Sequence, residues 1–226
     1  MKFLIVGPSW VGDAVMAQTL YKLIKNSNKD AQIEVLSPNW SINILGRMEE
    51  VSKSIASPFN HGELKMKARF DFAKQLREEG YERAIVMTNS LKSSLIPFFA
   101  KIPVRTGWLG EMRFGLINDL RSKEKHKNPL MIEQFAKLSI NPHEDLNKTL
   151  PYPSLRIDSH NLKEQLINLG IDSEKPSLAI CPGAEFGPAK KWPPSYYAEV
   201  CNEYLSNSWN VLVFGSQNDQ ITGNII

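Results

Sequence analysis

The sequence predicts an α/β protein with parallel sheets, organised as two successive units of which the second is incomplete. Apolar, strand-like runs alternate with helix-like patterns along the chain, which is typical of buried parallel strands joined by helices. A proline-rich polar stretch interrupts this alternation near residue 150, and a strand followed by a glycine turn occurs on both sides of it. A chain of 226 residues is long enough to bury one or two cores.

The first unit begins with the apolar run Lys2–Gly7, which predicts a buried strand leading through a glycine turn into a helix. Further strand candidates follow at Gln32–Leu36, Ser52–Ala56, Arg83–Thr88 and Val104–Gly107. Helical periodicity predicts helices at Asp13–Lys25, Trp40–Met48, Leu64–Glu79, Leu91–Lys101 and Leu130–Leu138. The alternation indicates a Rossmann-like domain, which we expect to occupy residues 1–150.

The second unit follows the polar, proline-rich linker Asn141–Pro153 and is expected to occupy residues 151–226. Its predicted elements are a helix at His160–Leu169, a strand at Ser177–Cys181, a helix at Pro194–Ser206 and a strand at Trp209–Phe214. Two strands and one crossover cannot form a doubly wound sheet with both faces covered. We therefore expect this second Rossmann-like domain to continue beyond Ile226.

Charge is distributed unevenly between the two units. Residues 1–150 carry 22 Lys and Arg against 16 Asp and Glu, whereas residues 151–226 carry 5 against 8. A basic first unit favours an acidic partner, such as a phosphorylated or carboxylated glycan or an anionic membrane surface. Nucleic acid is disfavoured, because the sequence has no nucleic-acid-binding motif and no clustering of arginine with aromatic residues.

Composition also disfavours secreted, membrane-spanning and metal-dependent proteins. The run Phe3–Gly7 is too short for the core of a signal peptide, and no later apolar run approaches membrane-spanning length, so we expect a cytoplasmic protein. Cys181 and Cys201 lack CxxC spacing, and the histidines are scattered. We therefore expect reduced thiols and no metal site.

The first candidate site is the turn Gly7–Asp13, which follows the first strand at the edge where ligands of open α/β sheets bind. It lacks the GKS/T ending of a phosphate-binding loop and the GxGxxG spacing of a dinucleotide site. Asp13 would also repel a phosphate there. This carboxylate could take a proton from an attacking hydroxyl, or it could simply N-cap the following helix, and the spacing leaves both roles open.

The second candidate site is the turn Cys181–Pro193, which has the opposite charge. Gly183 and Gly187 let backbone N–H groups face a ligand, and Lys190 or Lys191 could neutralise a departing diphosphate. The alternative is a solvated lysine pair before a helix. The segment Phe214–Asp219 follows the last strand and could contact the same ligand, or it could be only a turn.

A third cluster, Thr88–Ser94, follows the strand predicted at Arg83–Thr88. It supplies hydroxyls, an amide and a lysine, a mixture that suits a polyhydroxylated, anionic ligand. The alternative is an ordinary helix N-cap formed by a serine or asparagine.

These segments resemble the bacterial ADP-heptose:lipopolysaccharide heptosyltransferases of glycosyltransferase family 9. The resemblance spans the whole sequence, and its most specific part is Cys181–Pro193. The other segments that carry it are Gly7–Met16, Thr88–Ala100 and Arg105–Arg113. It implies a GT-B type architecture with the acceptor bound by the first domain and ADP-heptose by the second, with no metal and no other cofactor.

The resemblance also implies roles for particular residues. Asp13 would deprotonate the acceptor hydroxyl for inverting attack, and Lys190 would stabilise the leaving diphosphate. The implied acceptor is the heptosylated Kdo–lipid A inner core at the cytoplasmic face of the inner membrane, where the protein would make peripheral contact. The acceptor-binding residues are expected to be Ser9, Gly12, Asn89, Ser90, Lys92 and Arg113. The donor-binding residues are expected to be Gly183, Gly187, Lys191, Gly215 and Ser216.

Two alternatives remain open from the sequence. One is a nucleotide-sugar epimerase of the same architecture, which would act on the donor itself and need no lipid acceptor. The other is a non-catalytic binding fragment in which Asp13 only caps a helix. The chain could also be inactive without the remainder of its second domain.

Overall fold

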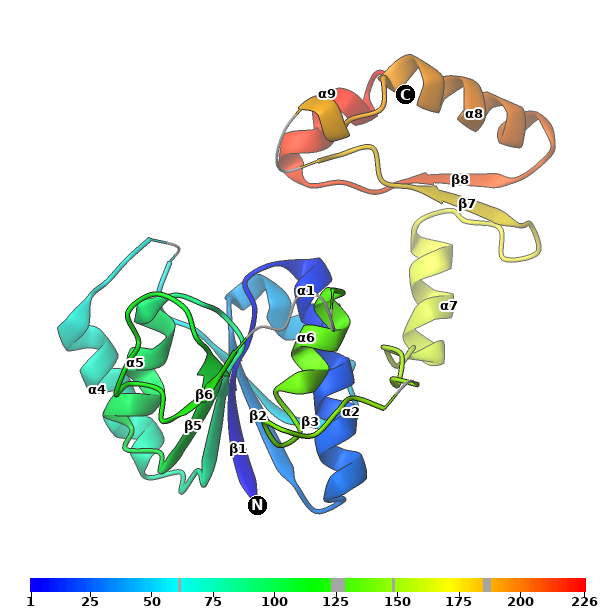
Figure 1. Cartoon of the computed structure of the whole chain (residues 1–226). Helices are drawn as coiled ribbons and strands as arrows, with labels where there is room; N and C mark the ends of the chain where they lie inside the picture. Colours follow the sequence, from blue (N-terminus) through cyan, green and yellow to red (C-terminus); the bar gives the residue numbers. More distant parts are fainter. Residues whose placement is uncertain (61, 123–128, 148, 185–187) are drawn as a thin grey trace. The chain divides into compact units, whose positions relative to one another are not determined.

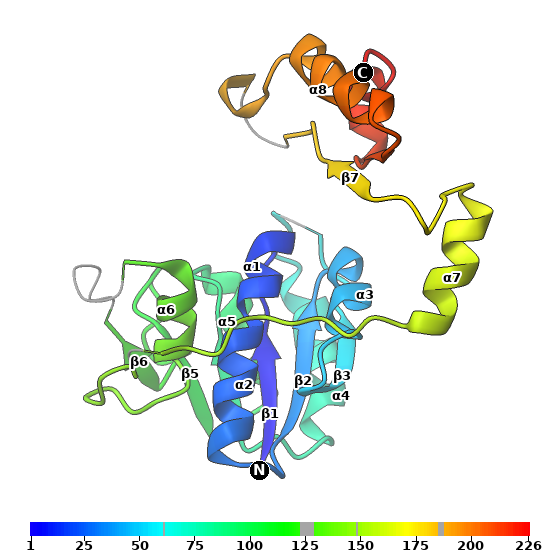
Figure 2. The ribbon, with the colours of Figure 1, turned by 90° about the vertical axis from the view of Figure 1, so that its right-hand side faces the viewer.

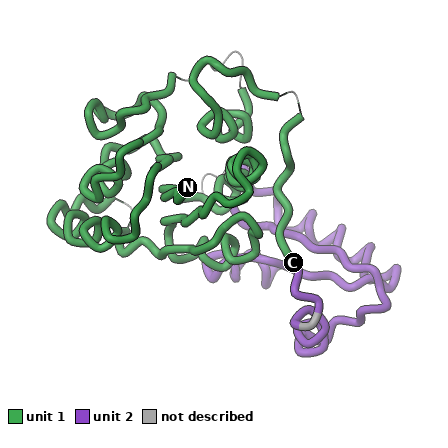
Figure 3. The backbone as a smooth tube through the Cα atoms, turned by 90° about the horizontal axis from the view of Figure 1, so that it is seen from below, with its two compact units in different colours: residues 1–156 green, residues 157–226 purple. Residues whose placement is uncertain are grey.

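The chain forms two compact units, Met1–Arg156 and Ile157–Ile226, which Figure 3 colours separately. The computed structural model describes residues 1–60, 62–122, 129–147, 149–184 and 188–226. The first unit therefore extends beyond residue 150 to include six residues of the segment expected to begin the second domain.

A parallel sheet with strand order β3-β2-β1-β4-β5-β6 forms the centre of the first unit (Figure 1). Its strands are β1 (Lys2–Val6), β2 (Gln32–Ser37), β3 (Val51–Ala56), β4 (Arg83–Val86), β5 (Val104–Trp108) and β6 (Asp119–Arg121). The chain builds β2 and β3 on one side of β1 and then builds β4, β5 and β6 on the other. The topological switch point, where ligands bind in such sheets, therefore lies between β1 and β4.

Helices cover both faces of this sheet (Figures 1 and 2). The helices on one face are α1 (Val11–Met16), α2 (Gln18–Ser27), the short α3 (Ile42–Leu45) with its preceding 3₁₀ turn η1 (Asn39–Ser41), and α6 (Met131–Lys137). Those on the other face are α4 (Met66–Arg77) and α5 (Leu91–Phe99). Alternate residues of β1 point to opposite faces of the sheet. Phe3 and Ile5 pack in the core under α2, whereas Leu4 packs in the core under α4 and α5.

The observed strands begin and end within two residues of the predicted ones. Two helix predictions were wrong. The helix predicted at Asp13–Lys25 is two helices that divide at Ala17, and the first begins at Val11. The segment predicted as one helix at Trp40–Met48 contains the end of the 3₁₀ turn η1 and the four-residue α3, because Ser41, Asn43 and Gly46 are poor helix formers.

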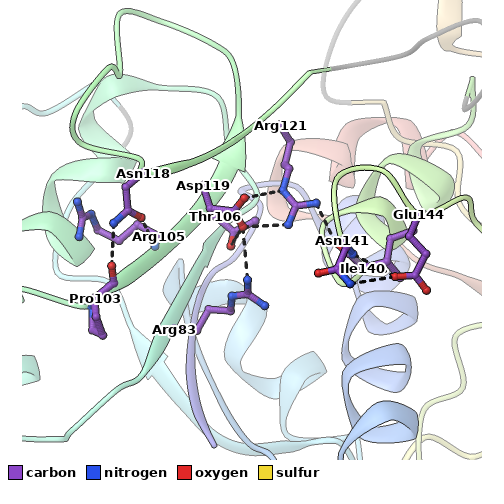
Figure 4. A network of polar contacts seen from close by, with 10 residues as sticks. All are labelled: Arg83, Pro103, Arg105, Thr106, Asn118, Asp119, Arg121, Ile140, Asn141 and Glu144. Atoms are coloured by element: carbon purple, nitrogen blue, oxygen red, sulfur yellow. Dashed lines mark hydrogen bonds and ion pairs between the residues drawn. The ribbon is translucent and has the colours of Figure 1, made fainter.

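The edge strand β6 was not predicted, and a polar network holds it in place (Figure 4). Asp119 accepts hydrogen bonds from Arg121 Nε and Nη2, both at 2.9 Å, and from Thr106 Oγ1 at 2.8 Å. Arg83 lies 3.5 Å from the same carboxylate, and Arg121 Nη1 donates to the carbonyl of Ile140 at 2.8 Å. The network thus joins β4, β5 and β6 to the chain that follows α6.

Residues 151–156 run along α2 as a strap that belongs to the first unit. Gln18 Nε2 donates to the Ser154 carbonyl at 2.8 Å, and the Ser154 amide donates back to Gln18 Oε1 at 2.7 Å. Thr19 Oγ1 donates to the Pro151 carbonyl at 2.8 Å, and the Arg156 amide donates to the Arg47 carbonyl at 2.8 Å. Part of the segment expected to be a free linker is therefore bound to the first unit.

Replacing Gln18 with alanine is expected to release this strap, because Gln18 is 1% exposed and makes both bonds to Ser154. The variant loses these two bonds and the bond from Gln18 Nε2 to Glu50 Oε2, and the loss of the two strap bonds should cost about 1–3 kcal/mol of local stability. Hydrogen exchange would show faster exchange at Ser154 and Arg156, whereas Gln75→Ala on the exposed face of α4 should leave these amides protected. Unchanged protection of these amides in the Gln18 variant would contradict the conclusion that Gln18 holds the strap against α2.

The second unit contains a two-stranded parallel sheet of β7 (Ser177–Ile180) and β8 (Asn210–Val213). Its other elements are α7 (Ser159–Asn168), the 3₁₀ turn η2 (Pro188–Lys190), α8 (Pro194–Ser206), the 3₁₀ turn η3 (Gln217–Asp219) and α9 (Gln220–Gly223). Among the described residues of this unit only Ile180, Pro182 and Cys201 are fully buried. Strand residue Val213 is 44% exposed, so this small parallel sheet is not covered as larger ones are.

Candidate active site

A pocket of about 270 Å³ lies in the first unit at the carboxyl ends of β1, β4 and β5. Its position is that of the topological switch point, and we call it the switch-point pocket. It is lined by Pro8, Ser9, Trp10, Asp13, Met87, Thr88, Asn89, Trp108, Met131, Gln134 and Phe135. Aromatic and apolar side chains thus surround a small number of polar groups, as in sites for small ligands.

Asp13 supplies the carboxylate of this pocket. It is the third residue of α1 and is half-buried. The alternative role suggested by the sequence, an N-cap, was wrong: the N-cap is Trp10, and no side chain makes a capping hydrogen bond there. The helix begins earlier than expected because Val11 and Gly12 already have helical geometry, which places Asp13 within its first turn.

Burial raises the pKa of Asp13 above its usual value. Among the described residues, none donates a hydrogen bond to its carboxylate. Asp13 lines the switch-point pocket, and its raised pKa increases its ability to accept a proton near neutral pH. This combination suits a general base.

The pocket also contains polar groups able to bind a hydroxylated ligand. Thr88 Oγ1 is buried and has no hydrogen-bond partner within the described part of the chain. Asn89 and Gln134 add two amide groups. These neutral groups can hydrogen-bond a ligand hydroxyl and orient it toward Asp13 without forming an ion pair with the carboxylate.

The expected acceptor-binding residues occupy different environments. Ser9 and Asn89 line the switch-point pocket together with Asp13. Gly12 is exposed on α1, and Ser90 is the N-cap of α5, where its Oγ accepts from the Ser93 amide at 3.3 Å. The N-cap that the sequence left as an alternative for this cluster is thus present, and Lys92 lies half-buried in the first turn of α5.

Arg113 lies away from the pocket surface, since it is 1% exposed. Its Nη1 donates to the Thr88 carbonyl at 2.6 Å, and its Nη2 donates to the Trp108 carbonyl. Burial lowers its pKa, and the charge of nearby Glu111 opposes that change. Direct contact between Arg113 and an acceptor remains a prediction from the sequence.

The sequence did not single out Gln134, Met131 or Trp108 as site residues. Trp108 ends β5 and could have been found by extending the strand-end rule to that strand. Gln134 and Met131 lie on α6, and no motif marks them. Only the packing of this helix beside α1 brings them to the pocket.

The expected donor-binding residues lie in the second unit, around Asp219. The Ser216 amide and hydroxyl donate to Asp219 Oδ2 at 2.9 and 2.7 Å. A Cβ added to Gly183 would lie 2.4 Å from the Asp219 carboxyl group, and one added to Gly215 would lie 2.9 Å from Asp219 Cβ. The two glycine turns therefore pack against the carboxylate of Asp219, the last residue of the candidate segment Phe214–Asp219.

The two lysines expected to bind the donor diphosphate are exposed. Lys190 ends η2 and Lys191 follows it, and both are exposed. Hydrogen bonds from Ser216 lower the pKa of Asp219, and the charge of Lys191 contributes to the same effect. Gly187 falls outside the described residues.

No group of three or more His, Cys, Asp or Glu side chains could hold a metal ion within the described ranges. In the same part of the chain, no helix has both the length and the apolar character needed to cross a bilayer.

Sequence comparison relates this chain to a known family. The family model for glycosyltransferase family 9 (heptosyltransferase) matches residues 69–226. Lipopolysaccharide heptosyltransferase 2 of Salmonella typhimurium is 43% identical over 100% of this chain, and that of Escherichia coli is 42% identical over the same share. The chain spans 66% of the length of each of these relatives.

Comparison with solved structures leads to the same family as comparison of sequences. The solved structure of E. coli ADP-heptose lps heptosyltransferase II matches with a TM-score of 0.91 and 40% identity, covering 99% of this chain and 67% of that chain. The predicted fold class, a GT-B type α/β protein with parallel sheets, is confirmed.

Proposed function

This chain belongs to glycosyltransferase family 9 (heptosyltransferase), and from that premise we propose that the protein transfers heptose from ADP-heptose to the inner core of lipopolysaccharide. The acceptor is the heptosylated Kdo–lipid A inner core. The observation that carries the proposal is the half-buried carboxylate of Asp13 in a pocket at the switch point of the sheet.

In the proposed reaction, the Asp13 carboxylate removes the proton of an acceptor hydroxyl as its oxygen attacks the anomeric carbon of the donor heptose. The bond between that carbon and the diphosphate oxygen breaks, and the electron pair leaves with ADP. Attack from the face opposite the diphosphate inverts the anomeric configuration. The exposed ammonium group of Lys190 stabilises the negative charge of the departing diphosphate.

The pocket composition supports an acceptor sugar in the first unit. Ser9, Thr88, Asn89 and Gln134 provide hydroxyl and amide groups around Asp13, while aromatic side chains provide apolar walls. The excess of positive charge in residues 1–150 favours an acceptor that carries phosphates and carboxylates. It also favours peripheral binding to the anionic cytoplasmic face of the inner membrane.

The test is a transfer assay with the full-length protein, isotopically labelled ADP-heptose and heptosyl-Kdo–lipid A. Label is expected in the lipid fraction only when donor and acceptor are both present. Conversion of ADP-heptose to an isomer without acceptor would instead identify an epimerase. Binding of either substrate without any turnover would leave only a binding role.

A further inference from the structure

The segment Leu109–Arg113, which follows β5, packs closely on the turn Thr88–Leu91, which follows β4. The Glu111 amide donates to the Asn89 carbonyl at 3.3 Å. In return, Glu111 Oε2 accepts from the Leu91 amide at 2.9 Å. Two hydrogen bonds of opposite direction thus connect these two strand ends through a single residue.

Gly110 allows this close approach. A Cβ at this position would lie 2.8 Å from the Asn89 carbonyl oxygen and 3.3 Å from Asn89 Cβ. The first distance is shorter than Cβ contacts in folded proteins, and its partner is a backbone atom that a rotamer change cannot move. Any larger residue here would displace the turn that carries Asn89.

Arg113 completes the connection from the buried side. Its guanidinium joins the Thr88 and Trp108 carbonyls, which lie at the carboxyl ends of the two strands. Within the described residues no carboxylate forms an ion pair with it, and its Nε has no hydrogen-bond partner. Burying the charged Arg113 side chain without an ion-pair partner costs free energy on folding. The main effect of Arg113 is therefore to fix the distance between the backbone at Thr88 and the backbone at Trp108.

We propose that Gly110, Glu111 and Arg113 form a clasp that holds Thr88 and Asn89 in position in the switch-point pocket. Arg113 is then a positioning residue that acts on the acceptor through Thr88 and Asn89, without touching it. The inference rests on the proposed function, because it takes this pocket as the acceptor site.

Gly110→Ala is the sharpest test, because it adds one methyl group and changes no charge. In the full-length protein it should raise the KM for heptosyl-Kdo–lipid A by on the order of tenfold or more, with an unchanged KM for ADP-heptose. The matched control is Gly46→Ala, whose new Cβ would lie no closer than 3.5 Å to a neighbour. It should keep both KM values of the wild type.

Further variants of Arg113 and Glu111 separate the clasp from direct contact. Arg113→Lys should raise the acceptor KM like Gly110→Ala, because one ammonium group cannot join two carbonyls in the same geometry. Glu111→Ala should also raise the acceptor KM. Glu111→Gln should keep the acceptor KM close to that of the wild type, because the glutamine amide oxygen can still accept from the Leu91 amide.

Two outcomes would overturn the proposal. If Arg113→Lys raises the acceptor KM but Gly110→Ala does not, Arg113 acts by direct contact. If the variants lower only the melting temperature, the clasp is structural. Hydrogen exchange of the Leu91 amide, which should become faster in Gly110→Ala, reports on the clasp even if the wild type transfers no heptose. That result keeps failure of the clasp distinct from failure of the proposed function.

Discussion

Replacing Asp13 with asparagine is expected to reduce heptose transfer by on the order of a hundredfold or more, because the amide cannot accept the proton of the attacking hydroxyl. The loss should appear in kcat, with little change in the KM for ADP-heptose. Folding should be preserved, since burial raises the pKa of Asp13 and the folded protein therefore gains nothing by holding this group charged. The measurement is steady-state transfer by the full-length protein, paired with a thermal melt.

The matched control is Asp30→Asn, which removes an exposed carboxylate in the turn between α2 and β2. It should transfer heptose at the wild-type rate. Equal rates for wild type and the Asp13 variant would exclude Asp13 as the base.

Activity of the wild type should also fall as the pH decreases through the pKa of Asp13, because the protonated carboxyl group cannot act as a base. Burial raises that pKa, so the decline should begin at a higher pH than for a fully exposed aspartate. A rate profile from pH 4 to 8 would show this acidic limb in the wild type, and its absence would argue against a buried base.

The largest expected loss of stability comes from Asp119→Ala. This change leaves Arg121, which is 4% exposed, without its carboxylate partner and also removes an acceptor from Thr106. Leaving a buried charge unpaired typically costs about 3–5 kcal/mol, and the partial exposure of Asp119 reduces this to about 2–4 kcal/mol. Native-state hydrogen exchange should show the loss at the amides of β5 and β6.

Asp71→Ala on the exposed face of α4 is the matched control and should leave those amides protected.

Burial opposes ionisation of Asp119, but hydrogen bonds from Arg121 and Thr106 outweigh this effect and hold the pKa of Asp119 below the usual value. The contribution of ionised Asp119 to the free energy of unfolding is therefore complete above the unfolded pKa of about 3.9. It is lost as the pH falls toward the pKa of Asp119 in the folded protein. The alanine variant should lack this part of the acid sensitivity.

The strands of the first unit could be predicted from the sequence because buried parallel strands are continuous apolar runs. Residues such as Leu4, Ile5, Ile85 and Val86 carry that signal. Strand β6 could not be predicted, since its three residues include Asp119 and Arg121, and their pairing is visible only in three dimensions. A short, charged segment has the local pattern of a loop.

The site was only partly predictable for a similar reason. The rule that ligands bind at strand ends led to Asp13 and Asn89, which the structure brings to one pocket. Gln134 reaches that pocket from a helix packed beside α1, and Asp219 reaches the glycine turns of the second unit from three residues after Ser216. The contact between Ser216 and Asp219 is local, but the approach of Gln134 to α1 and of Gly183 to Asp219 depends on how the chain returns to the sheet.

The strap along α2 has a consequence for synthesis on the ribosome. The first unit can bury its core once β5 and α6 have emerged, but Gln18 and Thr19 gain their bonds to Ser154 and Pro151 only when residues 151–156 follow. Translation at about 5–20 residues per second then needs roughly 4–14 s to deliver Ile157–Ile226. Because residues 151–156 precede Ser177–Val213 in the chain, the strap can bind α2 before β7 and β8 have been synthesised.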